Sequence, residues 1–178
     1  MTRSLIVVAA VTLFAGANPT TAPEFQHPLV KDYGGIVVVP DAAEPPRKDS
    51  KILLDVTSAE KKGDVLKGLD RAAVIANLYE QAGVGPSQGL KFAVVIHGPA
   101  TKAVLSQEAF ARRHDGAENP DRELIHRLRG AGVEIFVCGQ ALARQKFRTD
   151  EVSPDVTIAV SAATVHINKQ MDGYVLVP

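Results

Sequence analysis

The sequence contains a single cysteine, Cys138, and no tryptophan among its 178 residues. One cysteine cannot form a disulfide within the chain, and it excludes zinc sites that are built from several cysteines. Dithiol redox chemistry within one chain is excluded as well, because no Cys-x-x-Cys motif is present. With only three tyrosines and six phenylalanines, aromatic platforms for stacking nucleic-acid bases are scarce.

The chain also lacks net charge, with 20 Lys and Arg residues against 20 Asp and Glu residues. Because no basic cluster stands out either, nucleic acid is not a predicted partner. Apolar residues make up 46% of the chain, which is typical of globular proteins, and the length suits one compact domain.

Several catalytic and cofactor-binding signatures are missing. There is no Gly-x-Gly-x-x-Gly after the first predicted strand, no Walker loop and no Gly-x-Ser-x-Gly elbow. These absences argue against dinucleotide binding, nucleotide binding and α/β-hydrolase chemistry. No cofactor and no metal site is predicted, because His114, His126 and His166 lie on or near predicted helices without metal-ligand spacing and are expected at the solvated surface.

The N-terminal residues 1–22 have the pattern of a signal peptide. Arg3 supplies a positive charge, an apolar run follows, and small residues near Ala17 to Ala22 offer a cleavage site. The apolar run has about a dozen residues, against the roughly 20 that a membrane-spanning helix needs. We therefore expect an exported, periplasmic protein with no membrane span after cleavage. The alternatives are an uncleaved anchor or a buried N-terminal strand.

Residues 23–49 are rich in Pro, Ala and charge and predict an irregular N-terminal arm, in which 33–40 could form a short edge strand. Regular alternation of apolar segments begins near residue 50 and indicates one domain, 50–178, with Asn119 as a helix N-cap. The expected strands are 51–57, 90–98, 133–139, 156–162 and 174–178, and the expected helices are 65–83, 119–132, 140–147 and 164–173. Such alternation predicts a Rossmann- or flavodoxin-like three-layer α/β/α sandwich around a mostly parallel sheet of about five strands.

In a parallel α/β sheet, binding sites form outside the carboxyl ends of the strands. Cys138 is the candidate catalytic residue at these ends. The candidate binding residues that follow the predicted strands are Thr57, Ser58, His97, Gly98, Gly139, Gln140 and Ser161.

Cys138 stands where a strand meets the helix that begins near Gln140. The partial positive charge of a helix N-terminus favours thiolate over thiol, and Gly139 is expected to turn the backbone and keep the sulfur open to approach. The alternative is a buried, inert cysteine, because cysteine is among the most buried residue types. His97 could act as a base or an imidazolium beside the thiol, or it could only shape the turn that follows its strand.

The order of "ILLDVTS", a helix, "KFAVVIHG", "NP" opening a helix, "GVEIFVCGQAL", "VTIAVSA" and "DGYVLVP" resembles DsrE/DsrF-like proteins, most closely their exported branch. The resemblance covers nearly everything from Lys51 to Pro178. It implies a three-layer α/β/α fold, assembly into dimers, trimers or hexamers, and a link to sulfur metabolism. In the sulfur-relay members, a cysteine at this strand end carries sulfur as a persulfide, and Cys138 falls on that position. Those members are cytoplasmic, whereas this chain is predicted to be exported.

The leading hypothesis is a cofactor-independent, sulfurtransferase-like sulfur carrier, in which an accessible Cys138 accepts sulfur from a donor protein or passes it to an acceptor protein. The alternative is a non-catalytic homo-oligomer of the same fold that binds a small ligand or has a structural role. A third hypothesis, an enzyme that acts through His97 and hydroxyl groups, has no motif behind it.

Overall fold

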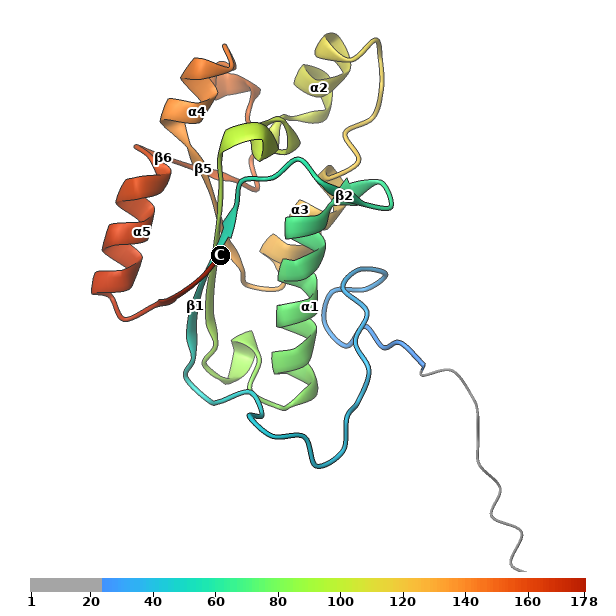
Figure 1. Cartoon of the computed structure of the whole chain (residues 1–178). Helices are drawn as coiled ribbons and strands as arrows, with labels where there is room; N and C mark the ends of the chain where they lie inside the picture. Colours follow the sequence, from blue (N-terminus) through green and yellow to red (C-terminus); the bar gives the residue numbers. More distant parts are fainter. Residues whose placement is uncertain (1–23) are drawn as a thin grey trace, which may run out of the picture.

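The computed structural model describes residues 24–178, and the predicted signal peptide lies outside the described residues. Its centre is a five-stranded sheet in the order β6-β5-β4-β1-β7, in which every neighbouring pair is parallel (Figure 1). The mostly parallel sheet of about five strands that the sequence predicts is therefore confirmed. The strands are β1 (Lys51–Val56), β4 (Lys91–Ile96), β5 (Glu134–Cys138), β6 (Thr157–Ala159) and β7 (Val175–Val177).

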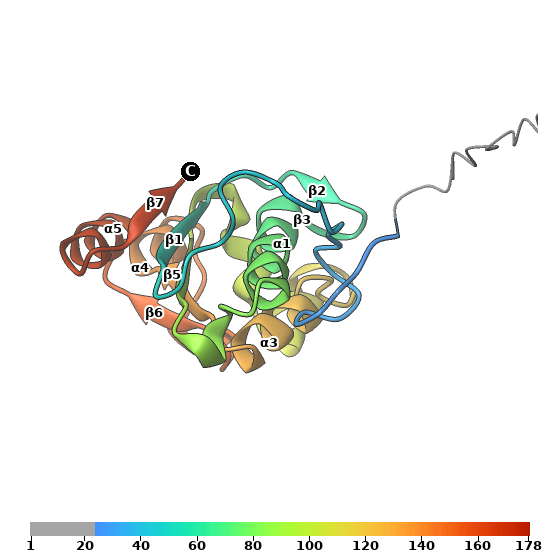
Figure 2. The same cartoon turned by 90° about the horizontal axis from the view of Figure 1, so that it is seen from below.

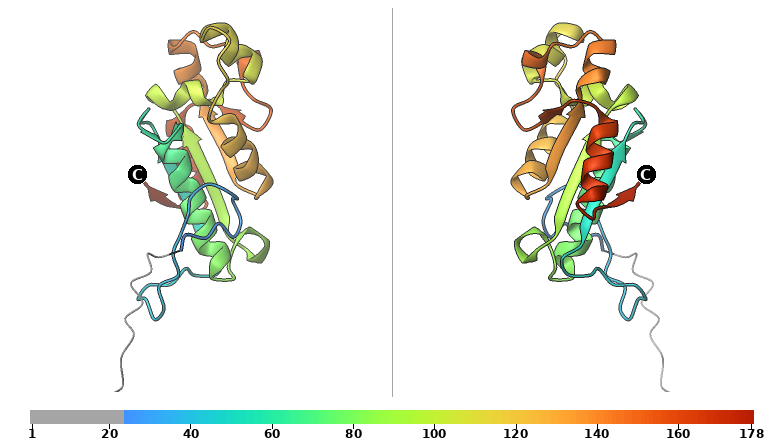
Figure 3. Two further views of the ribbon diagram at one scale, coloured as in Figure 1. Left: turned by 90° about the vertical axis from the view of Figure 1, so that its right-hand side faces the viewer. Right: turned by 90° about the vertical axis from the view of Figure 1, so that its left-hand side faces the viewer.

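Helices cover both faces of the sheet, as the views in Figures 2 and 3 show. On one face, α1 and α3 pack against alternate residues of β1, β4 and β5, and this side holds the larger apolar core. On the other face, α5 packs over Leu53, Ala93 and Val95. Because parallel strands joined by crossover helices bury both faces, these strands carry nearly continuous apolar runs. The helices are α1 (Lys67–Gln81), α2 (Gln107–Arg113), α3 (Arg122–Gly130), α4 (Gly139–Arg144) and α5 (Ala162–Met171).

Several short elements were not predicted. The two-residue strands β2 (Lys61–Lys62) and β3 (Val65–Leu66) form a small hairpin, and β3 occupies the first two residues of the predicted helix 65–83. Helix α2 was also missed, although Ser106 caps it by accepting a hydrogen bond from the backbone N–H of Ala109. Short 3-10 turns connect the remaining elements, at Pro86–Gln88, Gly98–Val104 and Thr149–Glu151.

Asn119 is not the N-cap that the sequence suggested, because α3 begins three residues later at Arg122. The Asn119 side chain is buried and donates hydrogen bonds to the carbonyl oxygens of Ala103 and Leu105. It therefore fixes the loop before α2 instead of capping α3.

The arm formed by the described residues 24–49 lies along α1 (Figure 1). Asn77 of α1 is fully buried; its Oδ1 accepts the N–H groups of Leu29 and Val30, and its Nδ2 donates to the carbonyls of Tyr33 and Gly34. Gly34 has φ +60°, and a Cβ there would overlap the backbone of α1, so only glycine allows this approach.

The segment 33–40 does not form the edge strand that the sequence suggested. Only an isolated bridge between Gln26 and Ile36 is present there. Among residues 24–178, no helix combines the length and apolar character that crossing a membrane requires.

Candidate functional site

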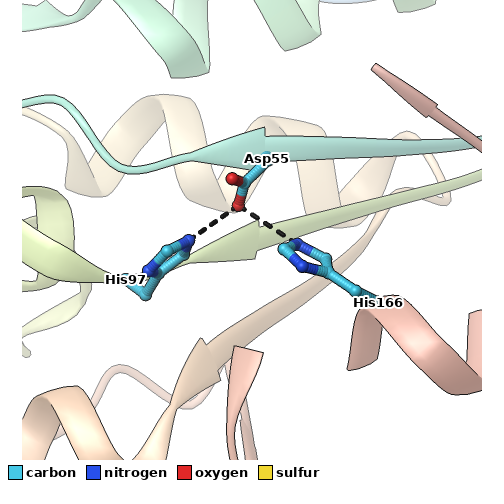
Figure 4. Close-up of side chains that lie close together, drawn as sticks. All are labelled: Asp55, His97 and His166. Atoms are coloured by element: carbon cyan, nitrogen blue, oxygen red, sulfur yellow. Dashed lines mark hydrogen bonds and ion pairs between the residues drawn. The ribbon is translucent and has the colours of Figure 1, made fainter. Parts of the chain in front are cut away.

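Three polar side chains converge at the carboxyl edge of the sheet, around Asp55 of β1. His97, directly after β4, places its Nε2 atom 2.9 Å from Oδ1 of Asp55. His166, in the middle of α5, places its Nε2 atom 3.2 Å from the same oxygen. Figure 4 shows both rings directed at one carboxylate. We call Asp55, His97 and His166 the His–Asp–His cluster.

The strand register explains why these groups meet. Asp55 pairs with Val95, so His97, two residues further along, lies on the same face of the sheet as Asp55. That face is covered by α5, whose buried residue Val165 precedes His166. Each side chain of the His–Asp–His cluster is partly buried, with exposed fractions of 23% for Asp55, 28% for His97 and 22% for His166.

Cys138 occupies the junction between β5 and α4 that the sequence predicts. It is the residue that precedes α4, and its extended backbone places it in the N-cap position. The register between β4 and β5 ends at the pair Ile96 and Val137, so His97 and Cys138 are the next residues on the two strands. The thiol-bearing residue and the His–Asp–His cluster therefore occupy neighbouring strand ends.

The expectation that Cys138 is accessible is not met in the single chain, because the residue is only 5% exposed. It belongs to the apolar cluster beneath α4 and α5, together with Val95, Ala141, Ala162 and Val165. Cys138 is therefore packed among apolar side chains.

Gly139 has a different role from the one that the sequence suggested. Its φ is not positive, so no special turn conformation requires glycine. A Cβ at this position would lie 2.9 Å from the carbonyl oxygen of Ala159. Glycine is needed because the end of β6 passes close to the first residue of α4. The next residue, Gln140, is exposed and donates from Nε2 to the carbonyl of Val160 at 3.2 Å.

The other candidate residues also lie at the carboxyl edge, but their main role is to shape the backbone that follows the strands. Thr57 and Ser58 are exposed after β1, and Ser58 accepts the N–H of Glu60. Gly98 begins a 3-10 turn with φ +56°, and its carbonyl accepts hydrogen bonds from Thr101 and Gln145.

Ser161 is the N-cap of α5, where its hydroxyl oxygen accepts the N–H of Thr164. It is therefore tied to the start of the helix that carries His166.

Sequence reasoning missed Asp55 and placed His166 at the solvated surface. Asp55 is a polar residue among the buried apolar residues of β1, Ile52 to Leu54 and Val56. His166 follows the buried residue Val165 on α5, and one residue on a helix gives no local signal of a partner on a distant strand. The charged residue inside an apolar strand was the one signal available. His126 agrees with the prediction, because it is 69% exposed and pairs only with Asp155.

A larger hollow lies elsewhere, between the arm, the β2–β3 hairpin and the loop before α3. It measures about 980 Å³ and is lined by Lys61, Lys62, Lys102 and Asp121 among others. None of the candidate residues lines it. A smaller hollow of about 220 Å³ is lined by Asp55, Thr57 and Ser58. We locate the candidate site at the strand ends, because the His–Asp–His cluster and the cysteine lie at neighbouring strand ends there.

The arrangement offers one nucleophile and one polar cluster. The thiol could form a covalent bond to sulfur once it is uncovered. The two imidazoles and the carboxylate could bind a cation or exchange protons with a bound molecule.

Comparison with known proteins agrees with this architecture. The chain resembles the solved structure of MTH1491, a protein of unknown function from Methanobacterium thermoautotrophicum, with a TM-score of 0.50 and 16% sequence identity. The match covers 72% of this chain and 98% of that one, and at this identity it supports the fold alone.

No curated protein matches the chain. The family model of the DsrE/DsrF-like family matches residues 51–178, from the start of β1 to the C-terminal residue. That range includes the whole sheet, the His–Asp–His cluster and Cys138, and the chain therefore belongs to the DsrE/DsrF-like family.

Proposed function

We propose that this protein is a sulfur carrier and that Cys138 is its sulfur acceptor. The observation that carries the proposal is the position of the only cysteine, at the carboxyl end of a central parallel strand and before a helix, in a chain of the DsrE/DsrF-like family. This family is linked to sulfur relay, and parallel sheets of this kind place their reactive groups at that edge.

The transfer step needs no cofactor and no external oxidant. The Cys138 thiolate attacks the outer sulfur of a donor persulfide, R–S–SH. A sulfur–sulfur bond to Cys138 forms, the sulfur–sulfur bond of the donor breaks, and the donor leaves as the thiolate R–S⁻. The bound sulfur then passes to an acceptor thiolate by the same exchange in reverse. The number of sulfur–sulfur bonds is unchanged in each step.

The burial of Cys138 adds a requirement to this mechanism. A donor cannot reach a sulfur in a residue that is 5% exposed, so α4 or α5 must move before transfer. Helix α4 has only six residues, and short peripheral helices belong to the parts of a protein that open at low free-energy cost. The carrier is therefore proposed to open locally when it meets its donor.

The proposal is tested by intact-mass spectrometry of the full chain after incubation with polysulfide or thiosulfate. One sulfur adds about 32 Da as a persulfide. Because the chain has one cysteine, any adduct reports on Cys138, and Cys138→Ser must abolish it. Unfolded protein in urea serves as the control for donor chemistry. A wild-type chain that loads only when it is unfolded would overturn the proposal.

A second candidate function is favoured by the same burial. In a non-catalytic homo-oligomer, Cys138 would be a small apolar residue that completes the packing of α5 on the sheet. Cys138→Ala would then leave assembly and ligand binding unchanged, and the folded wild type would not load with sulfur.

We also propose that the chain assembles with further copies of itself. Exposed apolar side chains occur on α5 and on or next to the edge strands β6 and β7, and exposed apolar surface is typical of contact surfaces. The residues are Ile158, Val160, Ile167, Met171, Val175 and Leu176. Ile167→Lys should convert the assembly to monomers in light scattering coupled to size-exclusion chromatography. The control Val39→Lys, at an exposed residue of the arm, should not do so.

Export remains part of the proposal. The N-terminal sequence of the protein isolated from its source cell is predicted to begin near Ala17 to Ala22. A mature protein that retains its initiator methionine would contradict cleavage.

A further inference from the structure

The His–Asp–His cluster has the composition of a metal site. It contains two imidazole nitrogens and one carboxylate oxygen, and these ligand atoms all lie within 4.8 Å of one another. They come from β1, the end of β4 and α5, so the tertiary fold brings them together. Two histidines with one carboxylate are the protein ligands of many catalytic zinc and non-haem iron sites.

The distances fit a small divalent cation after minor side-chain movement. Zinc binds imidazole nitrogen and carboxylate oxygen at about 2.0–2.2 Å, which places neighbouring ligands of a tetrahedral ion about 3.3 Å apart. The Oδ1 atom of Asp55 lies 2.9 Å from Nε2 of His97 and 3.2 Å from Nε2 of His166. Both distances are within a few tenths of an ångström of that spacing, and all three ligand atoms lie within 4.8 Å of one another.

The side chains also point the right way for ligands. Both histidines present Nε2 to the same oxygen of Asp55, His97 from the left and His166 from the right in Figure 4. The ring centroids are 6.1 Å apart with the planes at 74°, so the two imidazoles do not stack and can both face a common point. Partial burial protects such an ion from bulk water while leaving a side open for a further ligand.

The place of the cluster in the sheet indicates that these polar residues are not there for packing. Along β1, Leu53 occupies the same face as Asp55, and Val95 lies beside Asp55 on β4. An aliphatic residue at position 55 would continue this apolar row, whereas a carboxylate there needs polar partners. Two histidines from separate elements supply those partners.

From these observations we propose that Asp55, His97 and His166 bind one divalent transition-metal ion of the zinc type, with a water or a substrate atom as the remaining ligand. Cys138 is not a ligand: it is not among the residues that converge within this distance. The proposal does not depend on sulfur transfer, because the site is complete without the thiol.

The test measures zinc binding to the full chain, freed of metal by a chelator, by isothermal titration calorimetry. One equivalent of Zn²⁺ should bind, and Asp55→Asn, His97→Gln and His166→Gln should each weaken binding by at least about tenfold. His126→Gln is the matched control, because His126 also pairs with a carboxylate but is exposed and has a single partner. Circular dichroism and thermal unfolding establish that each variant is folded.

Two further measurements keep the result decisive. The absorption spectrum of the Co²⁺-substituted wild type should show nitrogen and oxygen ligation, without thiolate-to-cobalt charge transfer. This measurement does not depend on whether the variants fold. Cys138→Ser should bind zinc as tightly as the wild type. Any one of three results would overturn the proposal. The first is that the wild type shows no saturable binding of zinc, and the second is that His126→Gln and all three ligand variants bind it equally tightly. The third result is a loss of zinc binding in Cys138→Ser. Unchanged zinc binding in a chain that fails to load with sulfur would overturn sulfur transfer alone.

Discussion

Asp55 and His166 lie 111 residues apart in the sequence, and their Oδ1 and Nε2 atoms are 3.2 Å apart in the folded chain. This contact fastens α5 to β1 at the carboxyl edge of the sheet. Helix α5 also supplies Ala162 and Val165 to the apolar cluster that contains Cys138. Helix α5 therefore carries His166 and also helps to cover the thiol of Cys138.

This shared element leads to a prediction about zinc and the thiol. If the His–Asp–His cluster binds Zn²⁺, the ion holds α5 on the sheet and should slow the labelling of Cys138 by a thiol reagent severalfold. The same addition should leave labelling of His166→Gln unchanged. Labelling rates with and without Zn²⁺ measure the effect, and equal slowing in both proteins would contradict the link.

Gly139→Ala is predicted to destabilise the fold by about 1–3 kcal/mol, because small-to-large changes in packed regions cost that much. The added Cβ would lie 2.9 Å from the carbonyl oxygen of Ala159 and would push β6 away from α4. Urea unfolding measures the loss. Gly130→Ala is the control, because a Cβ there meets no atom within 4 Å and alanine favours the helix. Equal stability of the two variants would contradict this account of Gly139.

Asn77→Ala is predicted to release the arm from α1. The substitution removes four hydrogen bonds with backbone groups of the arm, and we expect a loss of about 2–4 kcal/mol in the free energy of unfolding. Limited proteolysis should cut within residues 24–49 faster than in the wild type. Gln81→Ala, at an exposed position of the same helix, is the control. An arm that stays protected in Asn77→Ala would show that other contacts hold it.

Acid is predicted to remove the stabilising contribution of Glu151. The Arg113 side chain and the backbone N–H of Arg148 donate hydrogen bonds to its carboxylate and lower the pKa of Glu151 from 4.5 to about 2. Because the pKa is lower in the folded state, the contribution is complete above about 4.5 and is lost as the pH falls toward 2. The difference in Tm between the wild type and Glu151→Gln should shrink over that interval. A constant difference would contradict the assignment.

The sheet could be predicted from the sequence because each central strand is a short apolar run between turn signals. The runs around Leu53, Val94 and Ile135 each place a strand within two residues of its observed bounds. The position of Cys138 followed from the same pattern. Short elements such as the β2–β3 hairpin could not be predicted, because two residues are too few to show the alternation of apolar and polar side chains that indicates a strand.

The His–Asp–His cluster could not be predicted, because its geometry depends on strand order and register. Nothing near His166 indicates that α5 crosses the end of β1, and Asp55 is one polar residue among the apolar residues that follow Lys51 in β1. The sequence left open whether Cys138 is buried or accessible, because its burial depends on how α5 packs.

The central claim is that a thiol in a residue that is 5% exposed becomes reachable in the folded protein. The most direct measurement is a titration of the Cys138 thiol with a small reagent under native conditions, followed by mass spectrometry. The sulfur-carrier account predicts complete labelling while near-ultraviolet circular dichroism and Tm show that the chain remains folded. A thiol that is labelled only at the rate of global unfolding would contradict the account and leave Cys138 as a packing residue.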